Sequence, residues 1–205
     1  MSGALVAGVL AGYGIAVPVG AIGAYLVSLT ARTNLRTGAC AALGVATADG
    51  LYALVAVAGG APLAPLVRTV QTPLRWGAAA VLLALAAQGA VRALRRHRDP
   101  SPPTDPQVAV SRAYLGLLGL TLLNPMTVIY FAALVLGGGE AVSGFGQRAV
   151  FAVAAFAASA SWQLLLAGSG ALLGRTLAGP RGRLVTALAS STLIAVLAVR
   201  LALSG

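Results

Sequence analysis

Residues 42–60, ALGVATADGLYALVAVAGG, form an apolar run that carries a single carboxylate, Asp49. The other three acidic residues, Asp99, Asp105 and Glu140, lie in short polar stretches. An ionisable group at the centre of a membrane helix costs at least about 2.5–3.5 kcal/mol on insertion scales, and it is kept where it faces a cavity, a partner or a passing solute. We therefore predict a functional role for Asp49. The alternative is a structural acid that is hydrogen-bonded to a neighbouring helix.

The composition of the chain indicates a polytopic membrane protein. Of its 205 residues, 59% are hydrophobic and only 9% are charged, whereas about a quarter of the residues of a soluble domain are charged. The net charge of +10 does not indicate nucleic-acid binding, because the arginines flank apolar runs as they do in membrane proteins. The single cysteine, Cys40, excludes an internal disulfide and a thiolate metal cage. We expect no metal and no cofactor.

Six apolar segments approach or exceed the length of about 20 residues that a transmembrane helix needs. They are Gly3–Leu29, Gly38–Gly60, Leu74–Val91, Ala113–Leu136, Ala149–Leu173 and Leu184–Leu203. The connections between them carry Gly, Pro or charge, as turns do. We predict an all-α fold of six transmembrane helices in one integrated membrane domain. Residues 1–94 and 112–205 would form two three-helix halves, and residues 95–111 a basic, proline-rich cytoplasmic linker.

The distribution of arginines predicts the orientation of these helices. The first, third and fifth connections hold ten arginines, and the opposite side of the membrane holds four. Because basic loops face the cytoplasm, both termini are expected outside. The N-terminus lacks a basic stretch, and its first apolar run is longer than the core of a signal peptide, so we expect no cleavable signal.

The two halves carry similar features in the same order. IAVPVGAIGAYLV (residues 15–27) and LLNPMTVIYFAAL (residues 122–134) each contain a proline, and TADGLYALVAV (residues 47–57) and SASWQLLLAGSG (residues 159–170) follow them. With three spans in each half, the second copy must be inserted upside down. Inverted repeats with interrupted helices at matching positions indicate the midplane site of a secondary transporter. The alternative is that Gly and Pro are simply frequent in membrane helices.

Pro18 and Pro125 are expected to break their helices, because each lacks a backbone N–H and clashes with the carbonyl four residues earlier. In lipid, the freed carbonyls are tolerated only where they face protein or a wet cavity, and the positive ends of broken helices suit a carboxylate. Asn124 adds an amide beside Pro125. Gly8–Gly12 and Gly170–Gly174 have the GxxxG spacing, which predicts close helix packing within the fold or in a dimer.

Taken in order, PVGAIG, ARTNLRTG, ALGVATADGLY, the basic central loop, NPMTVIYFAAL and SASWQLLL resemble the LysE/RhtB family of amino-acid exporters. The resemblance implies a transporter, not an enzyme, with six helices in inverted repeats in the bacterial inner membrane. It also implies export of amino acids or related metabolites, coupling to the proton gradient, and a homodimer surrounded by lipid. The positions that match the motifs of the family are Pro18, Gly20, Asp49, Asn124, Pro125 and Trp162.

The chain departs from the family pattern at two positions. Ala21 stands where many members have a second proline, and Met126 where many have a lysine. The missing cation means that the lysine, arginine or threonine exporters do not define the substrate of this chain. The chain also has no second buried acid that could bind a cationic side chain, so we favour a neutral or small polar substrate.

An amino acid offers an ammonium and a carboxylate to such a site. Asp49 could pair with the ammonium, while Asn124, Gln163 or freed backbone groups hold the carboxylate. Alternatively, Asp49 could carry the coupling proton. Tyr52, one turn after Asp49, lines the path or packs as an ordinary aromatic residue, and Trp162 forms a gate or a packing anchor.

Three other functions remain open from the sequence. A heavy-metal or cation exporter needs several carboxylate, His or Cys ligands in its spans, and only Asp49 is there. A membrane electron carrier needs two thiols, and the chain has only Cys40. A scaffold that transports nothing would leave the broken helices unexplained.

Overall fold

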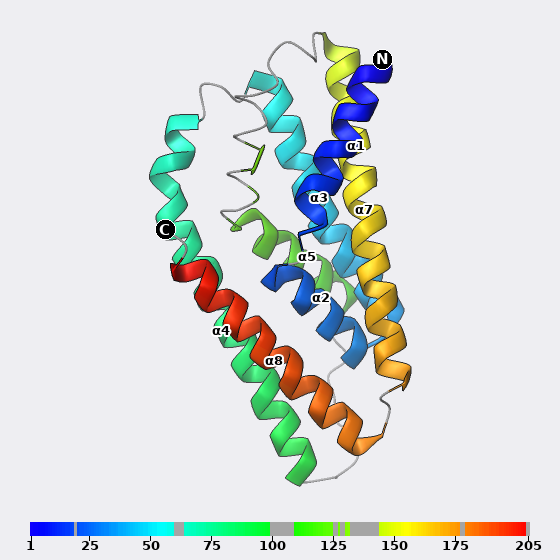
Figure 1. The fold of residues 1–205 in the computed structure, drawn as a ribbon, viewed down its shortest axis with the longest axis vertical. Helices are drawn as coiled ribbons and strands as arrows, with labels where there is room; N and C mark the ends of the chain where they lie inside the picture. Colours follow the sequence, from blue (N-terminus) through cyan, green and yellow to red (C-terminus); the bar gives the residue numbers. More distant parts are fainter. Residues whose placement is uncertain are drawn as a thin grey trace.

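The computed structural model describes residues 1–18, 20–59, 64–98, 109–124, 127, 130–131, 144–176 and 179–203. This part of the chain is helical (Figure 1). The helices are α1 (Ser2–Ala16), α2 (Ala21–Arg32), α3 (Leu35–Gly59), α4 (Ala64–Arg98), α5 (Val110–Leu122), α7 (Phe145–Thr176) and α8 (Pro180–Leu203). Within the described residues, four helices are long and apolar enough to cross a membrane, or up to five if α1 and α2 form one span. The all-helical, polytopic character is thus confirmed, whereas six spans in two repeats stay a prediction.

The first predicted span is broken at Pro18, as expected. α1 and α2 differ in direction by 76°. The N–H of Val17 still donates to the carbonyl of Tyr13, at 2.9 Å, but Pro18 has no N–H with which to continue the ladder. Gly20 precedes α2 in an extended conformation, with φ −97° and ψ −167°. The polypeptide therefore changes direction between two short helices within one apolar segment.

The third predicted span is part of a longer helix. α4 covers Ala64–Arg98, whereas we expected Leu74–Val91, with a loop before it and the linker from residue 95. Two prolines of this connection are part of the helix: Pro65 lies in the first turn of α4, where proline is tolerated because no N–H bond is needed, and Pro73 lies inside the helix. Residues 95–98 continue the helix because arginine is a good helix former and basic side chains favour a helix C-terminus.

The fourth predicted span is described only in part. α5 ends at Leu122, and the N–H of Asn124 then donates to the carbonyl of Thr121 at 3.0 Å. This end agrees with the expected break, because a residue that precedes proline is disfavoured in the helical conformation. Pro125 itself lies outside the described residues.

α7 is the central helix of the packing. It lies against α3, α1 and α2, while α5 packs on α3 and α4 pairs with α8. Figure 1 shows the α4–α8 pair on one side, α1, α3 and α7 on the other, and α2 and α5 between them. Asp49 and Trp162 therefore belong to the central α3–α7 pair.

The first GxxxG pair brings α1 onto α7. A Cβ placed at Gly8 would lie 2.8 Å from the Cβ of Ala154, and one placed at Gly12 would lie 2.8 Å from the Cβ of Ala158. Distances of this kind require the small residues that membrane helices use at close crossings. The first motif therefore acts within the fold.

The second GxxxG pair joins α7 to α2. A Cβ at Gly170 would meet the backbone of Val27, and one at Gly174 would meet the backbone of Ala31. Both arms of the broken first span are thus attached to α7 by glycines.

Candidate functional site

Asp49 lies in the middle of α3, and its side chain is 3% exposed. The hydroxyl of Ser159, a buried residue of α7, donates to Oδ2 of Asp49 at 2.6 Å. This length is typical of a hydrogen bond from a hydroxyl to a carboxylate. No cationic side chain of the described residues pairs with Asp49. The central helix pair is therefore joined by one carboxyl–hydroxyl contact.

Tyr52 connects the same part of α3 to the end of α5. Its hydroxyl donates to the backbone carbonyl of Leu122 at 2.5 Å, and its ring stacks on Phe131 with a centroid distance of 6.1 Å. The last carbonyls of a helix lack partners within the helix, so Tyr52 satisfies one that the end of α5 sets free. Tyr52 is therefore more than a packing aromatic residue, since it holds the end of the helix that precedes Pro125.

Asn124 does not contact Asp49 through any bond that the structure describes. Its Nδ2 donates to Oγ1 of Thr127 at 3.1 Å, and Thr127 is buried. The amide therefore bridges the chain on either side of Pro125 and Met126, so that a local hydrogen bond holds the segment at the second predicted break.

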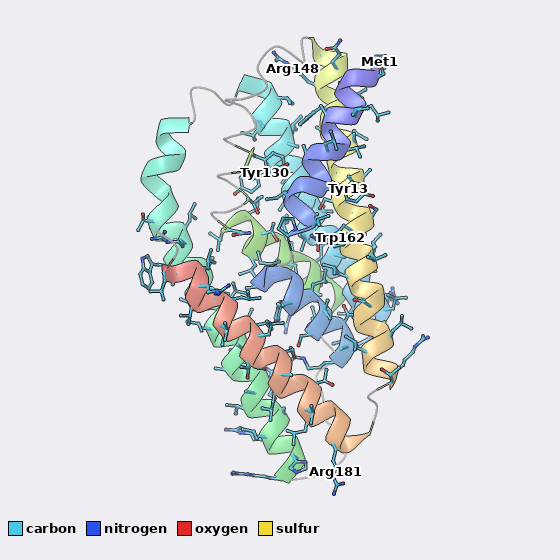
Figure 2. The ribbon with its side chains drawn as sticks, in the orientation of Figure 1. Met1, Tyr13, Tyr130, Arg148, Trp162 and Arg181 are labelled. Atoms are coloured by element: carbon cyan, nitrogen blue, oxygen red, sulfur yellow. The ribbon has the colours of Figure 1, made fainter. Side chains whose placement is uncertain are left out.

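Trp162 and Gln163 follow Ser159 on α7. Gln163 is 6% exposed. Neither Oε1 of Gln163 nor Nε1 of Trp162, both buried, has a hydrogen-bond partner within the described ranges. An unsatisfied buried polar group costs roughly 1–3 kcal/mol. Figure 2 places Trp162 on α7 beside the lower end of α1, where the first span breaks.

Pro18 and Gly20 lie at the break, and both are exposed. A Cβ placed at Gly20 would meet no atom of the described residues within 4 Å. Just before the break, the hydroxyls of Tyr13 and Ser161 are 2.8 Å apart and link α1 to α7.

The described surface includes a larger and a smaller hollow. The larger, of about 430 Å³, lies between α2, α7 and α8, has a mainly apolar lining and includes none of the predicted site residues. The smaller, of about 280 Å³, lies between α1 and α7 and is lined in part by Tyr13 and Ser161. We place the site at the polar contacts near the break and not at the larger hollow. No group of three or more His, Cys, Asp or Glu side chains gathers in the described part of the chain.

Two partners were not predicted from the sequence: Ser159 for Asp49, and Thr127 for Asn124. Ser159 could have been recognised because it lies four residues before Gln163, and residues at this spacing share a helix face. For Thr127 the sequence offers only its closeness to Asn124.

The chain was compared with known proteins. The family model described as LysE type translocator matches residues 14–205, which include every predicted site residue. No curated protein and no solved structure matched the chain.

Proposed function

Since this chain belongs to the LysE type translocator family, whose members are transporters and not enzymes, we propose that it exports amino acids or related small metabolites. Export would cross the bacterial inner membrane and proceed by proton antiport with alternating access. The observation that carries this proposal is the buried carboxyl of Asp49, with one hydroxyl donor and no cation of the described chain beside it. The arginine asymmetry supports basic loops in the cytoplasm and termini outside.

The Asp49–Ser159 contact suits a group that changes its protonation state. A hydroxyl donates to a carboxylate and accepts from a carboxylic acid, so Ser159 can stay bonded to Asp49 in both states. A structural acid in this position would need several donors or a cation, because a buried charge is costly unless it is paired. One neutral partner favours a proton carrier over a structural acid.

The helix packing supports alternating access between two related halves. A two-fold exchange of the halves would replace α1 by α5, α3 by α7 and α4 by α8. Under this exchange the α3–α7 and α4–α8 pairs map onto themselves, and the α1–α7 pair maps onto the α5–α3 pair. These are also the most extensive helix pairs among the described residues.

Two hydroxyl contacts are related in the same way. Tyr13 of α1 bonds to Ser161 of α7 at 2.8 Å, and Tyr114 of α5 bonds to Thr47 of α3 at 3.1 Å. In each case a tyrosine from the first helix of one half reaches the second helix of the other half. Ser161 and Thr47 each lie two residues from a member of the Asp49–Ser159 pair.

The membrane potential favours this mechanism for a neutral substrate. Exchange of a neutral amino acid for an incoming proton moves one positive charge into a negative interior. At 100 mV this contributes about 2.3 kcal/mol, which supports a concentration ratio of roughly 40- to 50-fold.

The proposal is tested by measuring which amino acids leave the cell. Cells that overproduce the protein are loaded with dipeptides, and the amino acids in the medium are compared with those from cells with Asp49→Asn. We expect release of at least one amino acid that the variant does not support, with equal amounts of both proteins in the membrane fraction. Normal release by Asp49→Asn would exclude the coupling role. Release equal to that of cells without the protein would exclude amino-acid export.

A further inference from the structure

The sequence offset between α7 and the residues that it contacts is the same in α1 and in α2, the two arms of the broken first span. At each glycine of the two GxxxG pairs the atom nearest to an added Cβ belongs to a residue 143 positions away: Phe151 for Gly8, Ala155 for Gly12, Val27 for Gly170 and Ala31 for Gly174. The same spacing brings Gly20, at the break, level with Gln163. The part of α7 that faces the break is therefore the part that begins near Ser159 and includes Trp162 and Gln163.

The close contacts between the first span and α7 are interrupted at the break. Helix backbone packs closely on α7 before the break and after it, but a Cβ at Gly20 would meet nothing within 4 Å in the described chain. Gln163 lies one turn beyond Ser159, about 6 Å along the axis, on the same buried face. Gln163 is therefore the next buried polar side chain after Ser159 along this face of α7.

The two polar atoms without partners offer one acceptor and one donor. Oε1 of Gln163 can only accept a hydrogen bond, and Nε1 of Trp162 can only donate one. Buried polar groups are normally hydrogen-bonded, and each exception calls for an explanation. A bound solute that both donates and accepts would satisfy the two atoms together.

We propose that Gln163 and Trp162 bind the ammonium and carboxylate groups of a zwitterionic substrate at the break, and that Asp49 is thereby left to carry the proton. The ammonium donates to Oε1 of Gln163, and the carboxylate accepts from Nε1 of Trp162. Both protein groups are uncharged, so this site favours a solute whose own charges cancel. The proposal rests on the proposed function and assigns separate residues to substrate and proton.

The test separates exchange of substrate from movement of protons. The full-length protein is reconstituted in liposomes, and exchange of radiolabelled alanine, serine, threonine, leucine and lysine is measured with no pH gradient. Such exchange requires substrate binding but no net movement of protons. The variants are Gln163→Leu, Gln163→Glu, Trp162→Phe and Asp49→Asn. Gln88→Leu, which removes an exposed amide from α4, is the matched control.

We expect Gln163→Leu to raise the KM for neutral amino acids at least about tenfold, the loss expected for one hydrogen bond to a charged group. Trp162→Phe raises the KM in the same direction, and Gln88→Leu leaves it unchanged. Asp49→Asn keeps exchange but loses accumulation driven by a pH gradient. Gln163→Glu has nearly the same shape as the native side chain, so it controls for misfolding, and it shifts preference toward lysine.

Two results overturn the inference while leaving the proposed function intact. One is a Gln163→Leu protein, or a folded Gln163→Glu protein, whose KM and preference equal those of the wild type. The other is an Asp49→Asn protein that loses exchange as well as accumulation, because Asp49 would then bind the ammonium. Absence of exchange of every probe by the wild type would instead overturn the proposed function.

Discussion

Replacing Gly12 by alanine tests the close contact of α1 with α7. The added Cβ would lie 2.8 Å from the Cβ of Ala158 and would also meet the carbonyl oxygen of Ala155. Carbon atoms in contact prefer about 3.5–4.0 Å, so the helices must move apart by about 1 Å. That movement also stretches the 2.8 Å contact between Tyr13 and Ser161. Overpacking of this kind lowers the free energy of unfolding by about 1–3 kcal/mol.

The same substitution has the opposite effect where a helix has room. Alanine is more stable than glycine in a helix by roughly 0.5–1 kcal/mol. Gly116 lies in α5, and a Cβ there would meet nothing within 4 Å in the described chain, so Gly116→Ala is the matched control. We expect Gly12→Ala to lose about 1–2 kcal/mol net, which lowers the melting temperature by about 2–8 °C. Gly116→Ala leaves the melting temperature unchanged or raises it.

The assay is thermal unfolding of the purified protein in detergent, followed by tryptophan fluorescence. A third variant, Gly174→Ala, carries the same test to the contact of α7 with α2, where the Cβ would meet the backbone of Ala31. Equal shifts for Gly12→Ala and Gly116→Ala would refute the reasoning, because the fold would then not depend on close contact at Gly12.

Tyr52→Phe should lower the free energy of unfolding by about 1 kcal/mol and slow export, because the carbonyl of Leu122 loses its donor. Thermal unfolding measures the first effect and the efflux assay the second. Unchanged values in both would contradict the role of this bond. Ser159→Ala should reduce export as Asp49→Asn does, because it removes the hydroxyl bonded to the carboxyl; retained export would show that the carboxyl acts alone. A cysteine introduced at Ser2, in a chain whose native cysteine is replaced, should react with an impermeant maleimide in intact spheroplasts; labelling only after lysis would reverse the predicted orientation.

The sequence predicted the parts of the fold that depend on local chemistry. Within the described residues the apolar runs are helical, and the first span breaks at Pro18, which has no N–H with which to continue the ladder. The predicted length of α4 was wrong, because Pro65 occupies a first turn, where proline fits, and Pro73 lies inside the helix.

The partners within the site depend on tertiary packing and could not be predicted in the same way. α7 carries Ser159, Ser161 and Ser169 within eleven residues. The four-residue spacing to Gln163 places Ser159 on the face of Gln163, but it does not show that this face meets Asp49. The choice follows from the rotation of α7 against α3, which is set by small residues along the whole contact. The bond from Tyr52 to the end of α5 likewise joins positions 70 apart in the chain.

The glycine contacts have a consequence for how the two halves of the chain depend on each other. α1 and α2 come from the first half of the chain but are fastened to α7 of the second half, while α5 of the second half is fastened to α3 of the first. Helices of each half therefore pack on a helix of the other half, and the central α3–α7 pair joins the two. A chain cut between α4 and α5 has no self-sufficient fragment, since each piece holds the surface that the other must cover. Function then depends on the two fragments meeting in the same membrane.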